Sequence, residues 1–173
     1  MHACVLPKKN HMLLGIHSIE VTAAVAHDRI IMWKVVEKPW NGEKAAIMYG
    51  ELGKALRKHY GNKRSFRVVE DGDTKGFQSS KGVKAKKEQR IESWKLGPRS
   101  PGWMPLDFCL WDEIEYRALS KREHDHEDAA SYSKRLRLTA FHLPRTVIPN
   151  CLARMKSNIE ATVESRGSHT ELE

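Results

Sequence analysis

Acidic residues are missing from the start of this chain, and cysteine and long apolar runs are scarce throughout. Residues 1–18 contain no Asp or Glu. The three cysteines, Cys4, Cys109 and Cys151, are far apart and odd in number, so the sequence predicts neither a disulfide framework nor a cysteine metal site and favours a reducing compartment. No apolar run approaches the roughly 20 residues of a membrane-spanning helix, and residues 1–12 lack the apolar core of a signal peptide. We therefore expect an intracellular protein with no membrane partner.

Positive charge is in excess. The 173 residues include 30 Lys and Arg against 22 Asp and Glu, which gives a net charge of +8 and a pI of about 9.5. Such an excess favours polyanionic partners, nucleic acid first and anionic membrane surfaces second, although a well-solvated basic protein has the same composition. Charged residues at 30% and hydrophobic residues at 40% indicate a globular chain, and its length suits one domain.

Apolar patterning predicts an alternation of strands and helices. Runs rich in Val, Ile and aromatic residues predict strands at 19–26, 30–36, 66–70 and 91–96. Helical periodicity, bounded by Gly and Pro, predicts helices at 43–60, within 77–90, and at 105–118, 129–143 and 146–165. This order indicates an α/β layer built on a mixed sheet. We expect Trp33, Trp111 and Cys109 in the core.

Two aspartates stand where predicted elements meet. Asp71 follows the strand at 66–70, Asp107 lies at the start of the helix that Pro105 opens, and 35 residues separate them. One carboxylate at a strand end and one at a helix start can converge on a divalent cation, and Mg²⁺ prefers one or two carboxylates plus water and phosphate ligands. The simpler interpretation is a turn aspartate and an aspartate favoured by the helix dipole. We interpret Asp73 as a turn residue.

The segments around these aspartates resemble two motifs of mariner-like transposases. Residues 71–74, Asp-Gly-Asp-Thr, resemble the Asp-Asn-Ala/Asp-Pro element of that family, and residues 100–107, Ser-Pro-Gly-Trp-Met-Pro-Leu-Asp, resemble its Ser-Pro-Asp-Leu-Asn-Pro-Ile-Glu/Asp element. The gap between the two acids is also typical of the family. The resemblance covers residues 16–119. The chain departs from the family's Asn, Pro, Asp and Asn with Gly72, Thr74, Gly102 and Met104.

The resemblance implies a ribonuclease H-like fold, Mg²⁺ or Mn²⁺ as cofactor, DNA as partner and DDE-type DNA cleavage and strand transfer. Asp71 and Asp107 would be the second and third catalytic acids and would bind the metal. The implied organisation is a short irregular N-terminal segment, a partial catalytic domain, a C-terminal helical extension and a tail, at residues 1–15, 16–119, 120–166 and 167–173. A homodimer is compatible with the family, and a eukaryotic member would be nuclear.

The family's first acid lies on the central strand of the sheet, ahead of residue 19, where this chain has no acid at all. Glu20 begins a strand and Asp28 lies in a turn at the far end of it, so neither is a good substitute. We therefore expect the sheet to lack its first, central strand, and the chain alone to be an incomplete nuclease.

A basic run follows Asp71, interrupted by one acid, Glu88. Cations in such a run can neutralise phosphates and give salt-dependent, sequence-blind DNA binding, although a solvated helix face has the same pattern. An inactive nucleic-acid-binding remnant is therefore the alternative to the transposase function. His124 and His126 lie in an acidic tract that lacks a second ligand pair at metal spacing, and we interpret it as an exposed connector. The candidate nucleic-acid-binding residues are Lys75, Lys81, Lys84, Lys86, Lys87 and Arg90.

Overall fold

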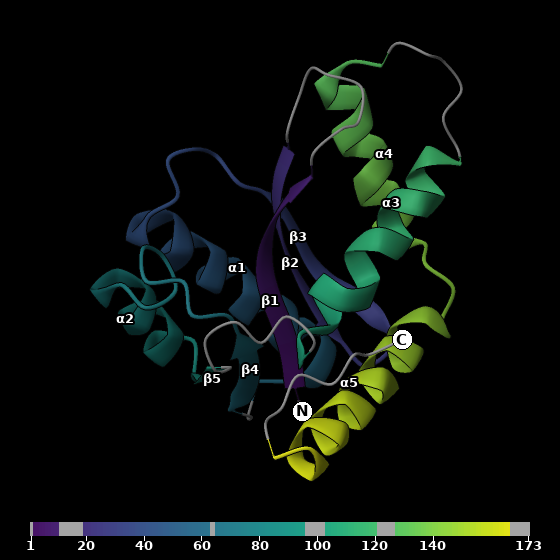
Figure 1. The fold of residues 1–173 in the computed structure, drawn as a ribbon. Coiled ribbons are helices and arrows are strands. Elements are labelled where there is room, and N and C mark those ends of the chain that lie inside the picture. The colour runs from purple at the N-terminus through teal and green to yellow at the C-terminus, as the bar shows by residue number, and fades with distance from the viewer. Residues whose placement is uncertain (1, 11–18, 63–64, 96–102, 121–126, 167–173) are drawn as a thin grey trace.

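A five-stranded mixed sheet forms the centre of the structure, and helices lie on both of its faces (Figure 1). The computed structural model describes residues 2–10, 19–62, 65–95, 103–120 and 127–166. The strands are β1 (His2–Asn10), β2 (Ile19–Ala26), β3 (Arg29–Val35), β4 (Phe66–Glu70) and β5 (Ile91–Lys95). The helices are α1 (Gly42–Tyr60), α2 (Ser80–Glu88), α3 (Trp111–Leu119), α4 (Ala129–Phe141) and α5 (Val147–Glu164), and a π-helical turn, η2 (Leu106–Leu110), leads directly into α3.

The strand order is β3-β2-β1-β4-β5, with β1 at the centre. β1 pairs antiparallel with β2 and parallel with β4, so that Val5 lies opposite both Ala24 and Glu70. β2 and β3 are antiparallel, and β4 and β5 are parallel. The predicted mixed sheet flanked by helices is confirmed. Two expectations are corrected. Residues 2–10 form a strand and not an irregular segment. That strand is the central strand of the sheet, which we expected to be missing.

Helices α1 and α2 cover one face of the sheet. Met48, Tyr49 and Leu52 on α1 are fully buried against Phe66 and Val68 of β4. Helix α1 begins at the predicted place because the Asn41 side chain accepts hydrogen bonds from the backbone N–H groups of residues 43 and 44, at 3.0 and 3.1 Å. It also approaches α2 closely: a Cβ on Gly53 would lie 2.9 Å from Cδ of Gln89. That glycine therefore allows the close packing of two helices that a larger residue would separate.

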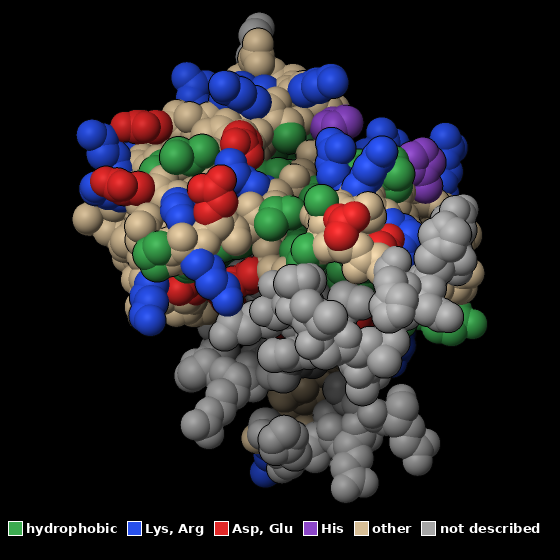
Figure 2. Space-filling model, turned by 90° about the horizontal axis from the view of Figure 1, so that it is seen from above, with side chains coloured by type: hydrophobic (Ala, Val, Ile, Leu, Met, Phe, Trp, Pro, Cys, Tyr) green, Lys and Arg blue, Asp and Glu red, His purple; other side chains and the backbone are tan. Residues whose placement is uncertain are grey.

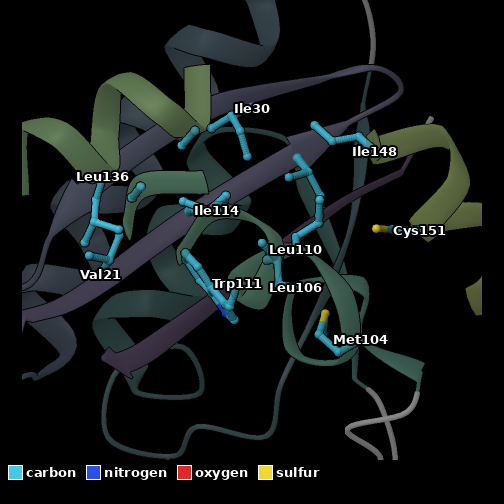
Figure 3. Close-up of a cluster of buried hydrophobic side chains, with 14 of the residues drawn as sticks. Val21, Ile30, Met104, Leu106, Leu110, Trp111, Ile114, Leu136, Ile148 and Cys151 are labelled. Atoms are coloured by element: carbon cyan, nitrogen blue, oxygen red, sulfur yellow. The ribbon is translucent and has the colours of Figure 1, made fainter. Parts of the chain in front are cut away.

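The opposite face carries η2, α3, α4 and α5. Leu106, Leu110 and Trp111 belong to one buried cluster with Val21 and Ile30 of the sheet (Figure 3). Leu136 of α4 and Ile148 of α5 complete the same buried cluster. Trp111 is buried as expected, and its ring lies 5.8 Å from that of Trp33, edge to face. This packing fixes η2 and α3 on the sheet.

Cys109 of η2 and Cys151 of α5 form a disulfide, with their Cα atoms 6.0 Å apart. This corrects the expectation that the cysteines stay unpaired. Forty-two positions separate the two residues in sequence, so their proximity depends on how α5 packs. Cys109 also packs against the core, as expected.

Among the described helices, none is both long enough and apolar enough to cross a membrane.

Candidate metal and nucleic-acid site

Three acids, Glu70, Asp71 and Asp73, lie at the end of β4 and just after it, and their side chains have different surroundings. Phe66 and Val68 pack on the α1–α2 face, whereas Val69 belongs to the core on the opposite face. Successive residues of a strand alternate between faces, so Glu70 lies with Val68. Asp71 comes directly after the last residue of β4.

Glu70 is fully buried and its carboxylate is neutralised within the domain. The Lys86 ammonium forms an ion pair with Oε1, and the Tyr49 hydroxyl donates to Oε2. Gln78 Nε2 donates to Oε1 over 2.9 Å, and Lys86 also donates to Ser93 Oγ over 3.0 Å. Burial, together with the charge and hydrogen bond of Glu70, raises the pKa of Tyr49 far above its usual range. This network holds α1, α2 and β5 to the end of β4.

Asp73 organises the loop between β4 and α2. Its Oδ2 accepts hydrogen bonds from Trp40 Nε1 over 2.7 Å and from the backbone N–H groups of Gly76 and Phe77 over 2.8 and 3.0 Å, while Oδ1 accepts from the Lys75 N–H over 3.1 Å. Burial acts to raise the pKa of Asp73, but these hydrogen bonds outweigh it and the pKa lies below its ordinary value. The interpretation of Asp73 as a turn residue is confirmed.

Asp71 is half-buried and has a different environment. Its Oδ1 accepts one hydrogen bond, from the Asp73 N–H over 3.2 Å. Burial raises the pKa of Asp71; that hydrogen bond lowers it, and the neighbouring charges of Asp73 and Glu70 raise it further. The net effect is a carboxylate whose charged form is disfavoured when no cation is near.

Asp107 lies on the π-helical turn η2, which the packing of its neighbours anchors. Pro105 precedes the turn, and Met104, Leu106 and Leu110 are all buried while Asp107 is exposed. The Trp111 N–H donates to the Leu106 carbonyl, the five-residue step that defines the turn. Such single π turns occur frequently at functional sites.

The structure brings the two elements that carry these aspartates to one strand. β4, which ends before Asp71, pairs with β1, and η2, which carries Asp107, lies against β1. Val69 shares a core cluster with Leu106 and Leu110, so the end of β4 and the η2 turn pack together on one side of the sheet. A third acid does not join them: no group of three or more His, Cys, Asp or Glu suited to a metal exists among the described residues, and β1 contains no acid.

Neither Asp28 nor Glu20 lies where the first catalytic acid would be expected, on the central strand. Asp28 lies in the β2–β3 turn, where Arg29 binds it over 2.8 Å. That hydrogen bond is the main reason why the pKa of Asp28 is lowered. Glu20 lies opposite Lys9, toward the end of β1 away from the β4 pairing. His124 and His126 are outside the described residues.

The candidate nucleic-acid-binding residues differ in exposure. Lys75, Lys81, Lys84, Lys87 and Arg90 are exposed. The Lys86 side chain is only 5% exposed and forms an ion pair with Glu70. The expectation that Lys86 binds nucleic acid is therefore corrected. A run of lysines along a helix places some of them inward, and an acid at the end of the apolar run 66–69 was the one sequence feature compatible with a buried cation partner.

The exposed cations lie on a surface of mixed charge. Lys81 pairs with Glu43, and Lys84 lies 3.9 Å from Glu88. Figure 2 shows basic and acidic side chains interspersed over the side where α1 and α2 lie. Lys87 and Arg90 have no ion pair within the described part of the chain, and they line an open cavity of about 550 Å³ between α2 and β5. Lys75 is likewise exposed and has no ion pair among the described residues, so these three cations are available to a polyanion.

No family model matches the sequence, and no curated protein matches it. The structure is similar to the catalytic domain of Mos1 mariner transposase, with a TM-score of 0.83 and 14% identity over 98% of this chain and 84% of that chain. A structure of the Mos1 catalytic domain with Raltegravir and Mg gives a TM-score of 0.80 at 16% identity, over 98% of this chain and 85% of that one. The Mos1 paired end complex with Mn gives 0.76 at 13%, over 98% of this chain and 56% of that chain. At these identities the likeness establishes the fold alone, and this chain has the ribonuclease H-like fold of the catalytic domain of that transposase.

Proposed function

We propose that this chain is a transposase-derived domain that binds DNA and a divalent cation, with Asp71 and Asp107 as metal ligands and DDE-type phosphodiester cleavage and strand transfer as its chemistry. The arrangement of the two acids carries the proposal, because the elements that hold them both lie against β1 in a ribonuclease H-like sheet. The transposase motifs around both residues add to this support. The Mos1 structures that bear the likeness include complexes with transposon ends, and DNA is accordingly the partner proposed for this chain.

The donor set fits one Mg²⁺ or Mn²⁺ ion. Two carboxylates, supplemented by water and substrate phosphate, are the ligands that such an ion prefers. When bound, the ion would polarise a phosphoryl oxygen and lower the pKa of a bound water. Asp71 and Asp107 would orient the ion, and the negative charge of Asp73 near Asp71 favours a cation there. The exposed Lys87 and Arg90 would draw the phosphate backbone to the same domain.

A pair of ions requires more ligands than these two acids supply. β1 occupies the position of the acid-bearing strand, yet residues 1–18 contain no Asp or Glu. This observation favours the second candidate function, an inactive domain that binds nucleic acid through its exposed cations. The two candidates differ in whether Asp71 and Asp107 still bind metal.

A metal titration tests the primary proposal. We expect the melting temperature of the purified chain to rise saturably with Mn²⁺, by about 5–10 °C at 100 times the Kd. Asp71→Asn and Asp107→Asn should each abolish the rise, whereas Asp112→Asn, on the helix that follows Asp107, should retain it. A cooperatively folded protein with no metal response would overturn the proposed metal site and leave the nucleic-acid-binding remnant.

A further inference from the structure

Three contacts join helix α5 to the segment around Asp107. Cys151 forms a disulfide with Cys109, two residues after Asp107. Trp103 Nε1 donates to Thr162 Oγ1 over 3.2 Å, and the Arg154 guanidinium lies 5.8 Å from the ring centre of Phe108. One covalent link and two weaker contacts therefore connect the C-terminal helix to the turn that carries the candidate metal ligand.

The disulfide is the strongest of the three restraints on η2. Cys151 is 1% exposed and packs in the core on the η2 face, while Cys109 is half-buried on the turn itself. Besides the disulfide, a long hydrogen bond and a cation–π contact join α5 to this segment within the described part of the chain. The N-cap residue of η2 is Pro105, and no side-chain hydrogen bond caps the start of the turn. Reduction would thus leave η2 held to α5 by these weaker contacts and by core packing, with no covalent link.

We propose that Cys151 is a positioning residue for Asp107: its disulfide with Cys109 fixes the η2 turn against β1, so that thiol oxidation strengthens metal binding at Asp107 and reduction weakens it. The metal part of this inference rests on the proposed function. The restraint on η2 does not, because it follows from the contacts of α5.

The redox step uses a disulfide oxidant such as oxidised glutathione. The more accessible Cys109 thiolate attacks one sulfur of the oxidant and releases one glutathione. The Cys151 thiolate then attacks the Cys109 sulfur and releases the second glutathione. Two thiols are oxidised, two protons are lost, and the oxidant is reduced to two thiols.

The test compares oxidised and reduced full chain in a Cys4→Ser background, which removes the third thiol. Mass spectrometry establishes the thiol state, amide hydrogen exchange of residues 106–111 reports the rigidity of η2, and Mn²⁺ binding is followed by electron paramagnetic resonance. We expect oxidation to slow exchange in η2 and to tighten Asp107-dependent Mn²⁺ binding about 10-fold, as loss of a ligand-orienting contact typically costs 10–100-fold. Cys151→Ser and Cys109→Ser should each behave like the reduced protein under both conditions.

Each outcome bears on one of the two proposals. Failure of oxidised glutathione to pair the two thiols, equal η2 exchange in both states, or equal Mn²⁺ affinity in both states overturns the positioning role. Slower η2 exchange on oxidation with no Mn²⁺ binding in either state supports the positioning of the turn and overturns the proposed metal function. The exchange measurement separates the two because it needs no metal.

Discussion

Lys86 and Glu70 form an ion pair inside the domain, with side chains that are 5% and 0% exposed. Tyr49 and Gln78 donate to the same carboxylate, and Lys86 also donates to Ser93. The residue that precedes Asp71 is thereby bound to α1, α2 and the loop between β4 and α2. The ion pair holds together the elements around one candidate metal ligand, without itself facing the metal.

Lys86→Met should lower the free energy of unfolding by about 3–5 kcal/mol, because removal of one partner leaves a buried charge uncompensated. Urea denaturation at neutral pH measures the change. Lys84→Met, on the exposed side of the same helix, is the matched control and should change stability by less than about 0.5 kcal/mol. A double variant, Glu70→Leu with Lys86→Met, should recover much of the loss. Equal effects of the two single lysine variants would contradict the structural role of Lys86.

Asp71→Asn and Asp73→Asn should change stability in opposite directions. Asp73 accepts hydrogen bonds from Trp40 and the loop backbone, so its replacement should destabilise the domain by about 1 kcal/mol, as for a lost capping carboxylate. Asp71 is half-buried and its pKa is raised, mainly by burial, so its replacement should stabilise the metal-free domain slightly, by less than about 0.5 kcal/mol because solvent screens a partly exposed charge. Thermal unfolding in the presence of a chelator measures both. Destabilisation by Asp71→Asn would show that the structural account of this carboxylate is wrong.

The pH dependence of these two variants should also differ. The folded-state pKa of Asp73 is lowered, so its contribution to stability is present above the ordinary value near 4 and is lost as the pH falls through the lowered pKa. The folded-state pKa of Asp71 is raised, so the Asp71 carboxylate lowers the free energy of unfolding at pH values above that raised pKa. This destabilisation disappears as the pH falls below about 4. Unfolding curves between pH 3 and 7 should therefore show the gain from Asp71→Asn shrinking first on acidification.

Local pattern was enough to predict several elements. β2 and β4 have the bounds expected from their apolar runs, and α1 differs by one residue, because a run of strand-forming residues or an apolar helical stripe requires no distant partner to be recognised. The apolar run at 30–36 also forms a strand, but Val35 at its end is 43% exposed, and β3 lies at the edge of the sheet. Whether a strand lies at an edge depends on sheet order, which its own sequence does not contain.

Features that depend on distant partners were missed. β1 contains Pro7, Lys8 and Lys9, and it is a strand because β2 and β4 pair with its two edges. Lys86 is buried because α2 packs on the face of β4 where the Glu70 side chain lies, and the two form an ion pair there. The pairing of Cys109 and Cys151 depends on the packing of α5 against η2. The alternation of β4 and the turn chemistry of Asp73, by contrast, followed from neighbouring residues.

Gly76→Ala should destabilise the loop that Asp73 organises. A Cβ at residue 76 would lie 2.5 Å from Cε2 of Trp40 and 2.8 Å from Oδ2 of Asp73, so the indole hydrogen bond to Asp73 would have to break or shift. We expect a loss of about 1–3 kcal/mol in the free energy of unfolding, typical of overpacking. Gly72→Ala is the matched control, since a Cβ there meets nothing within 4 Å. Comparable stability of the two variants in urea denaturation would contradict the role of Gly76.

DNA affinity should depend on salt, and the dependence should trace to Lys87 and Arg90. Each phosphate neutralised on duplex DNA contributes about −0.9 to the slope of log K against log salt concentration, so Lys87→Ala with Arg90→Ala should reduce the slope by about 2. Filter binding or fluorescence anisotropy over 50–200 mM salt measures it. Lys156→Ala, an exposed cation on α5 that lies 3.7 Å from Glu160, is the control and should leave the slope unchanged. Binding without salt dependence, or equal slopes for all variants, would exclude Lys87 and Arg90 as the DNA contact. Binding that survives Asp71→Asn together with no metal response would instead identify the domain as a nucleic-acid binder that has lost its chemistry.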